Sequence, residues 1–265
     1  MFTVLNVIQP DSLEEAYAAL MEKKNNVLLG GCAFLRLGSM RIGTAVDLSR
    51  LNLNTITEQD EILEIGATTT FRDIETNSLM NQYFNRVLPE AVKQIIGVQF
   101  RNTVMVGASV YSRYGFSDLL TALLALDTEV VLYKAGRLSL EAFLAKPYEK
   151  DILTKILIKK NDRKAAYQNM RNSASDFPIL NVAVSRMNHQ WKIAVGARPQ
   201  RAALALKASE EMSRGEFSSR NIEEIAAMAS QELVFGTNMR GTAIYREAIC
   251  KTLVQRAIKE VLQCE

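Results

Sequence analysis

The sequence contains few of the residues that build metal centres, and those few are scattered. Its 265 residues include three cysteines, Cys32, Cys250 and Cys264, and a single histidine, His189. No two cysteines have a Cys-x-x-Cys spacing, which disfavours a disulfide framework, a zinc site and an iron–sulfur site. We therefore expect no metal site, and any redox chemistry has to come from an organic cofactor or a partner chain.

Charge and hydropathy are also spread evenly. The net charge is +3, charged residues make up 23%, and no block of like charge occurs, so nucleic acid is not an expected partner. The apolar runs are shorter than the ~20 residues of a membrane span, and the opening Met1–Asn6 lacks a basic, apolar leader. We expect a cytoplasmic protein with no membrane segment, and its 48% hydrophobic content supports sizeable cores.

The first part of the chain reads as a small α/β unit. Strands are expected at Thr3–Ile8, Val27–Leu29 and Thr44–Leu48, where β-branched and apolar residues cluster. A helix is expected after Pro10, because Ser12 and Glu15 have the spacing of a capping box.

Further along, strands and helices alternate before a hairpin and two long helices. Strands are expected at 61–67, 129–133 and 153–158, and helices at 89–95 and 118–126. The chain then predicts a hairpin of Pro178–Met187 and Trp191–Val195, with His189 exposed in its turn. Apolar spacing predicts helices at 222–232 and 243–262.

Two segments rich in small residues suggest a nucleotide site. Gly30-Gly31 ends a strand, and glycine allows the positive φ and close backbone approach that a phosphate-binding turn requires. Gly97–Ser109 is a second such segment, followed by an apolar helix that opens on Ser117-Asp118. The alternative interpretation is that both are ordinary turns. Neither is a Rossmann fingerprint, since no Gly-x-Gly-x-x-Gly opens a helix.

These segments carry a family resemblance that covers nearly the whole chain. Leu29–Leu35 resembles the first phosphate loop, Arg101–Ser109 the second, and Arg240–Arg246 a third motif of the FAD-binding medium subunits of molybdenum hydroxylases, which include xanthine dehydrogenase and carbon monoxide dehydrogenase. The resemblance implies an α+β fold of the FAD-binding PCMH (vanillyl-alcohol-oxidase) type. It has two α/β subdomains and a C-terminal antiparallel sheet backed by helices. The expected domains are residues 1–55 and 56–162 for FAD-binding subdomains 1 and 2, and 163–265 for the C-terminal domain.

The same resemblance implies a set of cofactor-binding positions and no catalytic residue of the chain's own. The expected FAD-binding residues are Gly30, Gly31, Cys32, Ala33, Phe34, Leu35, Ile95, Met105, Val106, Gly107, Ala108, Ser109, Asp118, Leu153 and Asn169.

The second loop departs from the family pattern. Val104 and Ala108 replace glycines, Met105 replaces a hydroxyl residue, and Ser109 replaces asparagine. If Ala108 needs a positive φ the change costs roughly 1 kcal/mol, and the lost hydroxyl bond costs roughly another. Gly107 and Ser109 are expected to keep donor capacity, so binding is weakened or the loop reshaped.

Several of these residues also have structural interpretations. Asp118 is expected to accept from a ribose hydroxyl or an adenine amino group, or else Ser117 or Asp118 caps the following helix, and the two interpretations are compatible. Cys32 is read as a small buried thiol rather than a covalent flavin link. Asn169 stands where relatives place a lysine near the flavin, which is expected to change the reduction potential or the acceptor. Arg101, Arg240 and Arg246 are read as structural or interface residues.

Three functions remain open at this stage. The first is an FAD-binding electron-transfer subunit that passes electrons from an iron–sulfur partner, fed by a molybdopterin subunit, to NAD or another acceptor. The compact length and the segment Lys146–Thr154 look most like the short flavin subunits of purine hydroxylases and of complexes associated with selenate reductase, which makes purine oxidation a hypothesis about the complex. The second is a stand-alone flavin oxidase or reductase of the same fold. The third is a flavin-free scaffold that only assembles with the other subunits.

Overall fold

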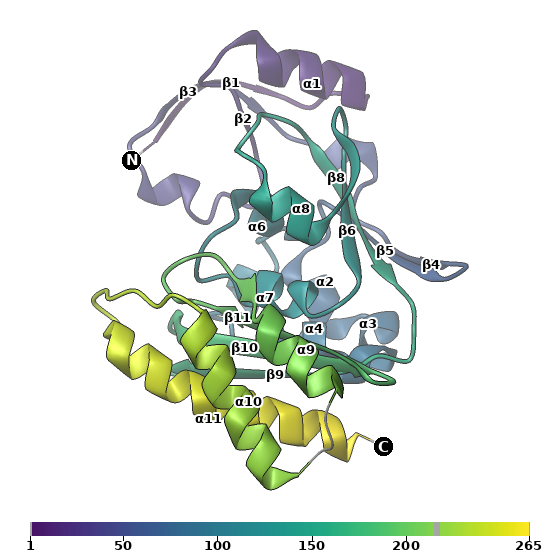
Figure 1. Cartoon of the computed structure of the whole chain (residues 1–265). Helices are drawn as coiled ribbons and strands as arrows, with labels where there is room; N and C mark the ends of the chain where they lie inside the picture. Colours follow the sequence, from purple (N-terminus) through teal and green to yellow (C-terminus); the bar gives the residue numbers. More distant parts are fainter. Residues whose placement is uncertain (1, 215–217, 265) are drawn as a thin grey trace. The chain divides into compact units, whose positions relative to one another are not determined.

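The computed structural model describes residues 2–214 and 218–264 (Figure 1). The chain forms two compact units, each built from separated stretches of sequence. Unit 1 contains the chain up to Asp73 together with Val98–Ser112 and Thr128–Ile158. Unit 2 contains Ile74–Gly97, Arg113–Asp127 and the chain from Lys159 onward. The domain boundaries expected after residues 55 and 162 stay predictions.

Unit 1 contains two sheets and several short helices. Its elements are β1 (Thr3–Ile8), α1 (Leu13–Glu22), β2 (Val27–Leu28), η1 (Leu35–Leu37), β3 (Arg41–Val46), η2 (Ser49–Leu51), β4 (Ile56–Gln59), β5 (Ile62–Gly66), α5 (Val98–Arg101), α6 (Val106–Ser112), β6 (Thr128–Leu132), β7 (Gly136–Ser139) and α8 (Leu140–Ala145). Two elements cross a unit boundary, α2 (Phe71–Thr76) and β8 (Leu153–Lys159).

The first sheet of unit 1 is parallel and has the order β1-β3-β2. Half of the predicted capping box forms at the start of α1, since the Ser12 hydroxyl accepts from the N–H of Glu15. The Glu15 carboxylate accepts from the N–H of Asp11, one residue before the N-cap, and not from that of Ser12. Behind the helix, buried Asn26 donates to the carbonyl of Ala19 at 2.7 Å and accepts from the N–H of Thr44 at 2.8 Å. Asn26, the residue that precedes β2, therefore links α1 to β3 through its side-chain hydrogen bonds.

The second sheet of unit 1 has the order β4-β5-β8-β6-β7. Strand β6 pairs with both β7 and β8 in antiparallel register. At the end of β5, Gly66 packs against the preceding loop so closely that a Cβ would lie 2.1 Å from the carbonyl oxygen of Leu53. Only glycine fits there, and the chain leaves the sheet at this point toward the second predicted phosphate segment.

Unit 2 is an antiparallel sheet of order β12-β11-β10-β9 covered by helices. Its elements are α3 (Ser78–Gln82), η3 (Phe84–Arg86), α4 (Val87–Val92), α7 (Asp118–Leu124), β9 (Lys164–Arg171), β10 (Pro178–Met187), β11 (Gln190–Gly196), β12 (Ala203–Leu204), α9 (Leu206–Arg214), α10 (Ser219–Glu232) and α11 (Ala243–Gln263). The predicted mixed α+β class and the C-terminal sheet backed by helices are confirmed.

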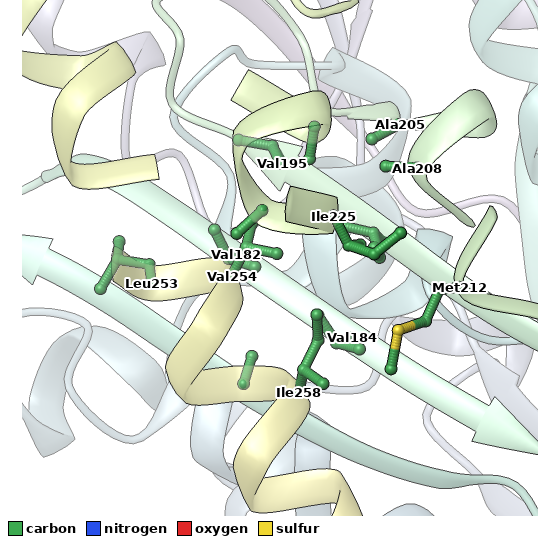
Figure 2. Close-up of a cluster of buried hydrophobic side chains, with 14 of the residues drawn as sticks. Val182, Val184, Val195, Ala205, Ala208, Met212, Ile225, Leu253, Val254 and Ile258 are labelled. Atoms are coloured by element: carbon green, nitrogen blue, oxygen red, sulfur yellow. The ribbon is translucent and has the colours of Figure 1, made fainter. Parts of the chain in front are cut away.

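The core of unit 2 lies between this sheet and its C-terminal helices (Figure 2). Val182 and Val184 alternate on one face of β10 and meet Val254 and Ile258, which lie four residues apart on α11. Fully burying one such side chain stabilises the fold by roughly 1.5–3 kcal/mol. The residues at the alternate positions of β10, which point to the other face of the sheet, include Asn181 and Ser185. They are also buried, so the strand is covered on both faces.

The structure differs from the expected elements at several places. Val106–Ser109 is not loop but the first part of α6. The helix predicted through Ile95 ends at Val92, and Ile95 lies in the bend that follows it. Strand β9, which pairs with β10 over its whole length, and helix α9 were not predicted, because β9 mixes polar and apolar residues without a strict alternation.

Candidate functional site

The two predicted phosphate segments meet within unit 1. A Cβ added to Gly30 would lie 2.2 Å from the Cβ of Ala108, and one added to Gly31 would lie 1.8 Å from the carbonyl oxygen of Thr103. Gly31 also has a φ of +84°, which L residues rarely adopt. Glycine is therefore required at both positions by the close approach of the two segments.

The first segment presents a run of backbone donors. The N–H of Leu29 still belongs to the sheet and donates to Val46 at 2.9 Å. Within residues 2–214 and 218–264, none of the next four N–H groups, from Gly30 to Ala33, donates to a protein acceptor. Consecutive N–H groups beside residues of positive φ, here Gly31 and Cys32, form a concave anion-binding surface.

The second segment offers fewer donors than the sequence suggests. The N–H of Val106 donates to Thr69, and that of Gly107 donates to Ala67, each at 2.8 Å. The expectation that Gly107 keeps a free donor is therefore wrong, since its role is close packing: a Cβ there would lie 2.6 Å from the Cβ of Ala67. Ala108 has no positive φ, so the alanine introduces no backbone strain. In the described chain its N–H is left without a protein acceptor.

A cavity of about 560 Å³ opens beside these segments in unit 1. Five of the predicted FAD-binding residues line it, namely Gly30, Met105, Gly107, Ala108 and Leu153. The wall also contains residues that sequence reasoning missed, namely Tyr111, Tyr148, Lys150 and Asp151. They come from α6 and from the stretch before β8, where no periodicity or motif marks them as site residues.

Cys32 lies in the first segment with its thiol half-buried, not fully buried as expected. Burial, and then the negative charge of Asp47, raise the pKa of the Cys32 thiol. Burial also acts on Asp47, but hydrogen bonds from Gln9 and Ser49 outweigh it and lower the pKa of that carboxyl. Cys32 therefore stays a thiol at neutral pH and is a poor nucleophile.

Asp118 lies in a buried polar network of unit 2. The cap of α7 is Ser117, whose hydroxyl accepts from the N–H of Leu120 at 3.2 Å. Oδ1 of Asp118 accepts from the hydroxyl of Tyr167 and from Nδ2 of Asn181 at 3.0 Å. It also forms an ion pair of 2.8 Å with Nη2 of Arg171. Ser117 thus supplies the cap, and Asp118 joins β9 and β10 to α7.

In this network the charge of the Asp118 carboxylate is paired with that of Arg171, and Tyr167 stays neutral. Burial, and then the charge of Asp118, raise the pKa of Tyr167 well above its ordinary value, so its hydroxyl stays protonated. For Arg171, burial lowers the pKa but the neighbouring Asp118 outweighs it and raises the pKa overall. The Arg171 guanidinium also donates through Nε to Oδ1 of Asn169 at 2.9 Å. Asn169 and Arg171 line a separate polar cavity of about 480 Å³ in unit 2.

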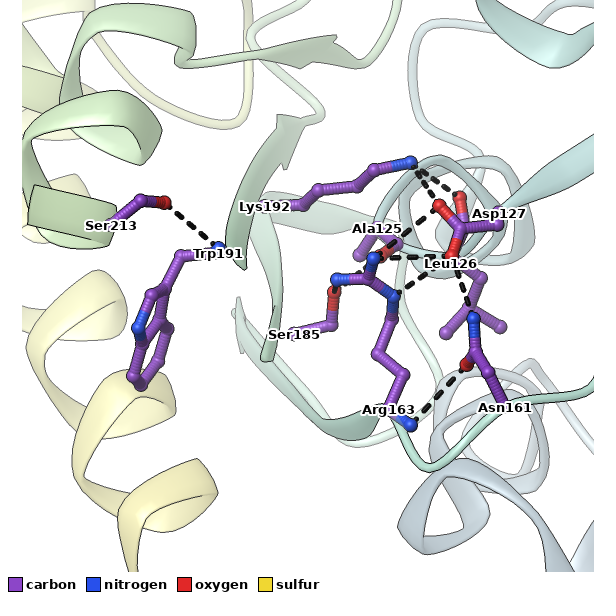
Figure 3. Close-up of polar contacts among 9 residues, drawn as sticks. All are labelled: Ala125, Leu126, Asp127, Asn161, Arg163, Ser185, Trp191, Lys192 and Ser213. Atoms are coloured by element: carbon purple, nitrogen blue, oxygen red, sulfur yellow. Dashed lines mark hydrogen bonds and ion pairs between the residues drawn. The ribbon is translucent and has the colours of Figure 1, made fainter. Parts of the chain in front are cut away.

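A second polar cluster of unit 2 surrounds Asp127 (Figure 3). Its carboxylate accepts from Nδ2 of Asn161 at 2.8 Å and pairs with Arg163 at 3.1 Å and with Lys192 at 2.8 Å. Burial alone raises the pKa of Asp127, but the bond and charge of Lys192 and the charge of Arg163 outweigh it and lower the pKa to about 2. Arg163 is itself buried and also donates to Ser185 at 3.2 Å. This cluster fastens the start of β9 to the end of α7.

The third motif folds around a buried arginine. Arg246 donates to the carbonyls of Ile179 at 2.8 Å and Gly236 at 2.7 Å, and to Oδ1 of Asn238 at 2.6 Å. It also donates to the carbonyl of Gly241. Arg246 is therefore structural, as expected from the sequence.

Other kinds of site find no support in the described part of the chain. His189 is exposed in the turn between β10 and β11, as predicted. Among residues 2–214 and 218–264, no three His, Cys, Asp or Glu side chains come together as metal ligands. In the same residues, no helix is both long and apolar enough to cross a membrane.

Comparison with known proteins places the chain among flavin-binding subunits. Residues 2–160 match the model described as the FAD binding domain in molybdopterin dehydrogenase, and residues 165–261 match the CO dehydrogenase flavoprotein C-terminal domain. The chain is 25% identical to the glyceraldehyde dehydrogenase medium chain of Sulfolobus acidocaldarius, over 96% of this chain and 97% of that protein. It is 23% identical to the nicotine 6-hydroxylase medium subunit of Paenarthrobacter nicotinovorans, over 95% of each.

A solved structure shows the same fold. The chain superposes on the carbon monoxide dehydrogenase of Hydrogenophaga pseudoflava with a TM-score of 0.87, covering 97% of each chain at 22% identity.

Proposed function

Because the chain belongs to the family of FAD-binding domains in molybdopterin dehydrogenases, we propose that it is the electron-transfer medium subunit of a cytoplasmic molybdenum hydroxylase. In this role it takes electrons from an iron–sulfur partner that a molybdopterin subunit feeds, and it passes them through FAD to NAD or another acceptor. FAD is the cofactor of the family, and when bound it supplies the redox chemistry.

The observation that carries the proposal is the run of N–H groups from Gly30 to Ala33, which have no acceptor among the described residues and begin at Gly30 in the cavity wall. A pyrophosphate needs several converging donors, and backbone N–H groups provide them without a charged side chain. The N–H of Ala108, brought next to Gly30 by their close packing, is a further donor within unit 1. The residues present therefore fit a dinucleotide despite the altered second segment.

The remaining predicted contacts form part of the proposal. Phe34, Leu35, Met105, Val106, Ser109 and Leu153 belong to unit 1, and Ile95, Asp118 and Asn169 belong to unit 2. For Asp118 we retain the proposed contact with a ribose hydroxyl or an adenine amino group, which rests on the family resemblance, while in unit 2 its carboxylate is buried against Tyr167 and Arg171. Asn169 supplies no cation, and we infer that the flavin potential or the acceptor is tuned accordingly.

The substrate of the complex belongs to its partners. The named relatives are the medium chain of a glyceraldehyde dehydrogenase and the medium subunit of a nicotine 6-hydroxylase, so the two differ in the substrate of their enzymes. We retain purine oxidation as the hypothesis for this complex, based on the segment Lys146–Thr154.

The electron path is tested by anaerobic reoxidation. The FAD-loaded chain is reduced with dithionite and desalted, and NAD or a quinone is added while the flavin spectrum is recorded. If the flavin is reoxidised by NAD and an equal amount of NADH forms, NAD is supported as the acceptor. If only the quinone reoxidises the flavin, the acceptor is of the quinone type and the proposal of NAD is wrong. A purified iron–sulfur partner that has first been reduced should transfer its electrons to the oxidised flavin of the loaded chain. Failure of that transfer would overturn the electron-transfer role in favour of a stand-alone enzyme.

A further inference from the structure

Asn169 lies in the wall of the polar cavity of unit 2, together with Glu90, Lys93, Tyr167 and Arg171. We propose that Asn169 donates a hydrogen bond to the carbonyl edge of the isoalloxazine, and that the absence of an unpaired cation among these described residues makes the bound flavin take up two protons when it is reduced. This inference rests on the proposed FAD site and deepens it, because it states how this chain sets the charge of its reduced cofactor.

The amide of Asn169 is held in one orientation. Its Oδ1 accepts from Nε of Arg171, which follows two residues later on the same face of β9, at 2.9 Å. The acceptor end of the amide is thereby occupied, while its Nδ2 has no acceptor among the described residues. An amide fixed in this way keeps N–H donors for a ligand. The ligand that it suits has acceptor atoms along a flat edge, as the dione ring of a flavin does.

Each cation of the cavity wall has a carboxylate beside it. Nη2 of Arg171 pairs with Oδ1 of Asp118 at 2.8 Å, and both side chains are only 5% exposed. Lys93 forms an ion pair with Glu90, one turn earlier in the chain. Burial, and then the charge of Asp118, raise the pKa of Tyr167, so this group stays neutral. Because opposite charges in contact cancel most of each other's potential a few ångströms away, the wall offers dipoles without a net positive charge.

The charge of the reduced flavin depends on that wall. Two electrons from the iron–sulfur partner and one proton at N5 leave a negative charge on the N1–C2 carbonyl edge of the ring. A cation at this edge would stabilise that charge directly, whereas the neutral amide of Asn169 stabilises it less. A second proton from solvent therefore binds N1, and the reduced flavin carries no charge on its ring.

The test uses the FAD-loaded full chain and measures the reduction potential of the bound flavin against pH with a reference dye. Wild type should take up two protons per electron pair across the neutral range. Asn169→Lys places a cation at the same edge and should lower the uptake to one proton per electron pair. Sulfite gives an independent readout, because it adds to N5 and leaves its electron pair on the N1–C2 edge. Asn169→Lys should bind sulfite about tenfold more tightly than wild type, or tighter still.

Two further variants isolate the effect of charge. Glu90→Gln leaves Asn169 intact but removes the carboxylate that pairs with Lys93, so it should strengthen sulfite binding by a smaller factor. Glu260→Gln is the matched control, since Glu260 lies on α11 and contacts Gln168, which points to the other face of β9. This control should leave both the potential and sulfite binding unchanged.

The outcomes separate this inference from the proposed function. If wild type neither contains nor takes up FAD, the proposed function fails and this inference fails with it. If FAD is bound but wild type takes up one proton per electron pair, or Asn169→Lys binds sulfite no more tightly than wild type, the role of Asn169 is overturned while the FAD site stands. If Asn169→Lys loses FAD, Glu90→Gln decides, and a result equal to that of Glu260→Gln overturns the inference.

Discussion

Gly30 and Ala108 lie so close together that a Cβ on Gly30 would be 2.2 Å from the Cβ of Ala108. This contact brings the unpaired N–H groups after β2 to the start of α6. It also explains how the chain tolerates alanine in place of the family's glycine: Ala108 lies in helical backbone, and its methyl group fills the space that Gly30 leaves.

The contacts around the glycines of unit 1 predict that two alanine variants, Gly31→Ala and Gly136→Ala, differ strongly in FAD binding. Gly31→Ala would place a Cβ 1.8 Å from the Thr103 carbonyl oxygen and should abolish FAD binding, because the segment must move. Gly136 has a similar φ of +72° but nothing within 4 Å, so Gly136→Ala should cost only about 1 kcal/mol and retain flavin. Flavin content per chain and urea unfolding measure both effects. Equal flavin loss in the two variants would refute the contact's role.

The charge cluster around Asp127 predicts a stability loss in acid. The folded-state pKa of about 2 lies below the ordinary value of 3.8, so the stabilisation is complete above about pH 4–5 and disappears as pH falls toward 2. The difference corresponds to about 2 kcal/mol of unfolding free energy. Asp127→Asn should lose this part of the pH dependence in urea titrations, whereas the exposed neighbour variant Asp162→Asn should retain it.

Replacing Arg246 should lower the free energy of unfolding strongly, although its bonds in the structure go to carbonyl and amide oxygens and not to a carboxylate. Arg246→Met leaves several buried acceptors, including the carbonyls of Ile179 and Gly236, without a donor. We expect a loss of about 3 kcal/mol or more in unfolding free energy, because each unsatisfied buried group costs about 1–3 kcal/mol. Arg220→Met removes an exposed i,i+4 pair and should change stability by less than about 0.5 kcal/mol. Comparable losses in chemical denaturation would contradict this account.

The Asp118 network predicts strong coupling between two buried charges. Asp118→Ala leaves the Arg171 guanidinium buried without its carboxylate and should cost about 3–5 kcal/mol. Asp118→Ala combined with Arg171→Met should be more stable than the single Asp118 variant, because no isolated charge remains. A double-mutant cycle by urea unfolding gives the coupling, and additive effects would argue that the pair is not coupled.

Local signals predicted much of the fold. Ser12 and Glu15 gave the first helix start, and the β10–β11 hairpin followed from two apolar runs around Asn188-His189. Strand β9 was missed because its polar and apolar residues do not alternate strictly, and its pairing with β10 is visible only in the folded chain. The opening of α6 was missed because glycine and alanine there resemble a loop until their packing against Ala67 is known.

The candidate site was only partly accessible to sequence reasoning. The family resemblance predicted Gly30, Gly107 and Leu153 as site residues, and in the structure all three line one cavity of unit 1. Tyr148 and Lys150 belong to the segment Lys146–Thr154, which was compared with purine hydroxylases but not predicted to line the site, and the fold brings them to that cavity. The sequence also does not show which backbone N–H groups lack an acceptor. The N–H of Gly107 donates to the carbonyl of Ala67, whereas the N–H of Ala108 has no acceptor among the described residues.

The most direct test of the account is the flavin content of the purified full chain. Its visible spectrum would be recorded, and the flavin released on denaturation would be identified and counted per chain, with FAD added back to any flavin-free protein. We predict near-stoichiometric FAD that Gly31→Ala removes and Gly136→Ala retains. Folded wild-type protein that neither contains nor takes up FAD would contradict the account and favour the flavin-free scaffold.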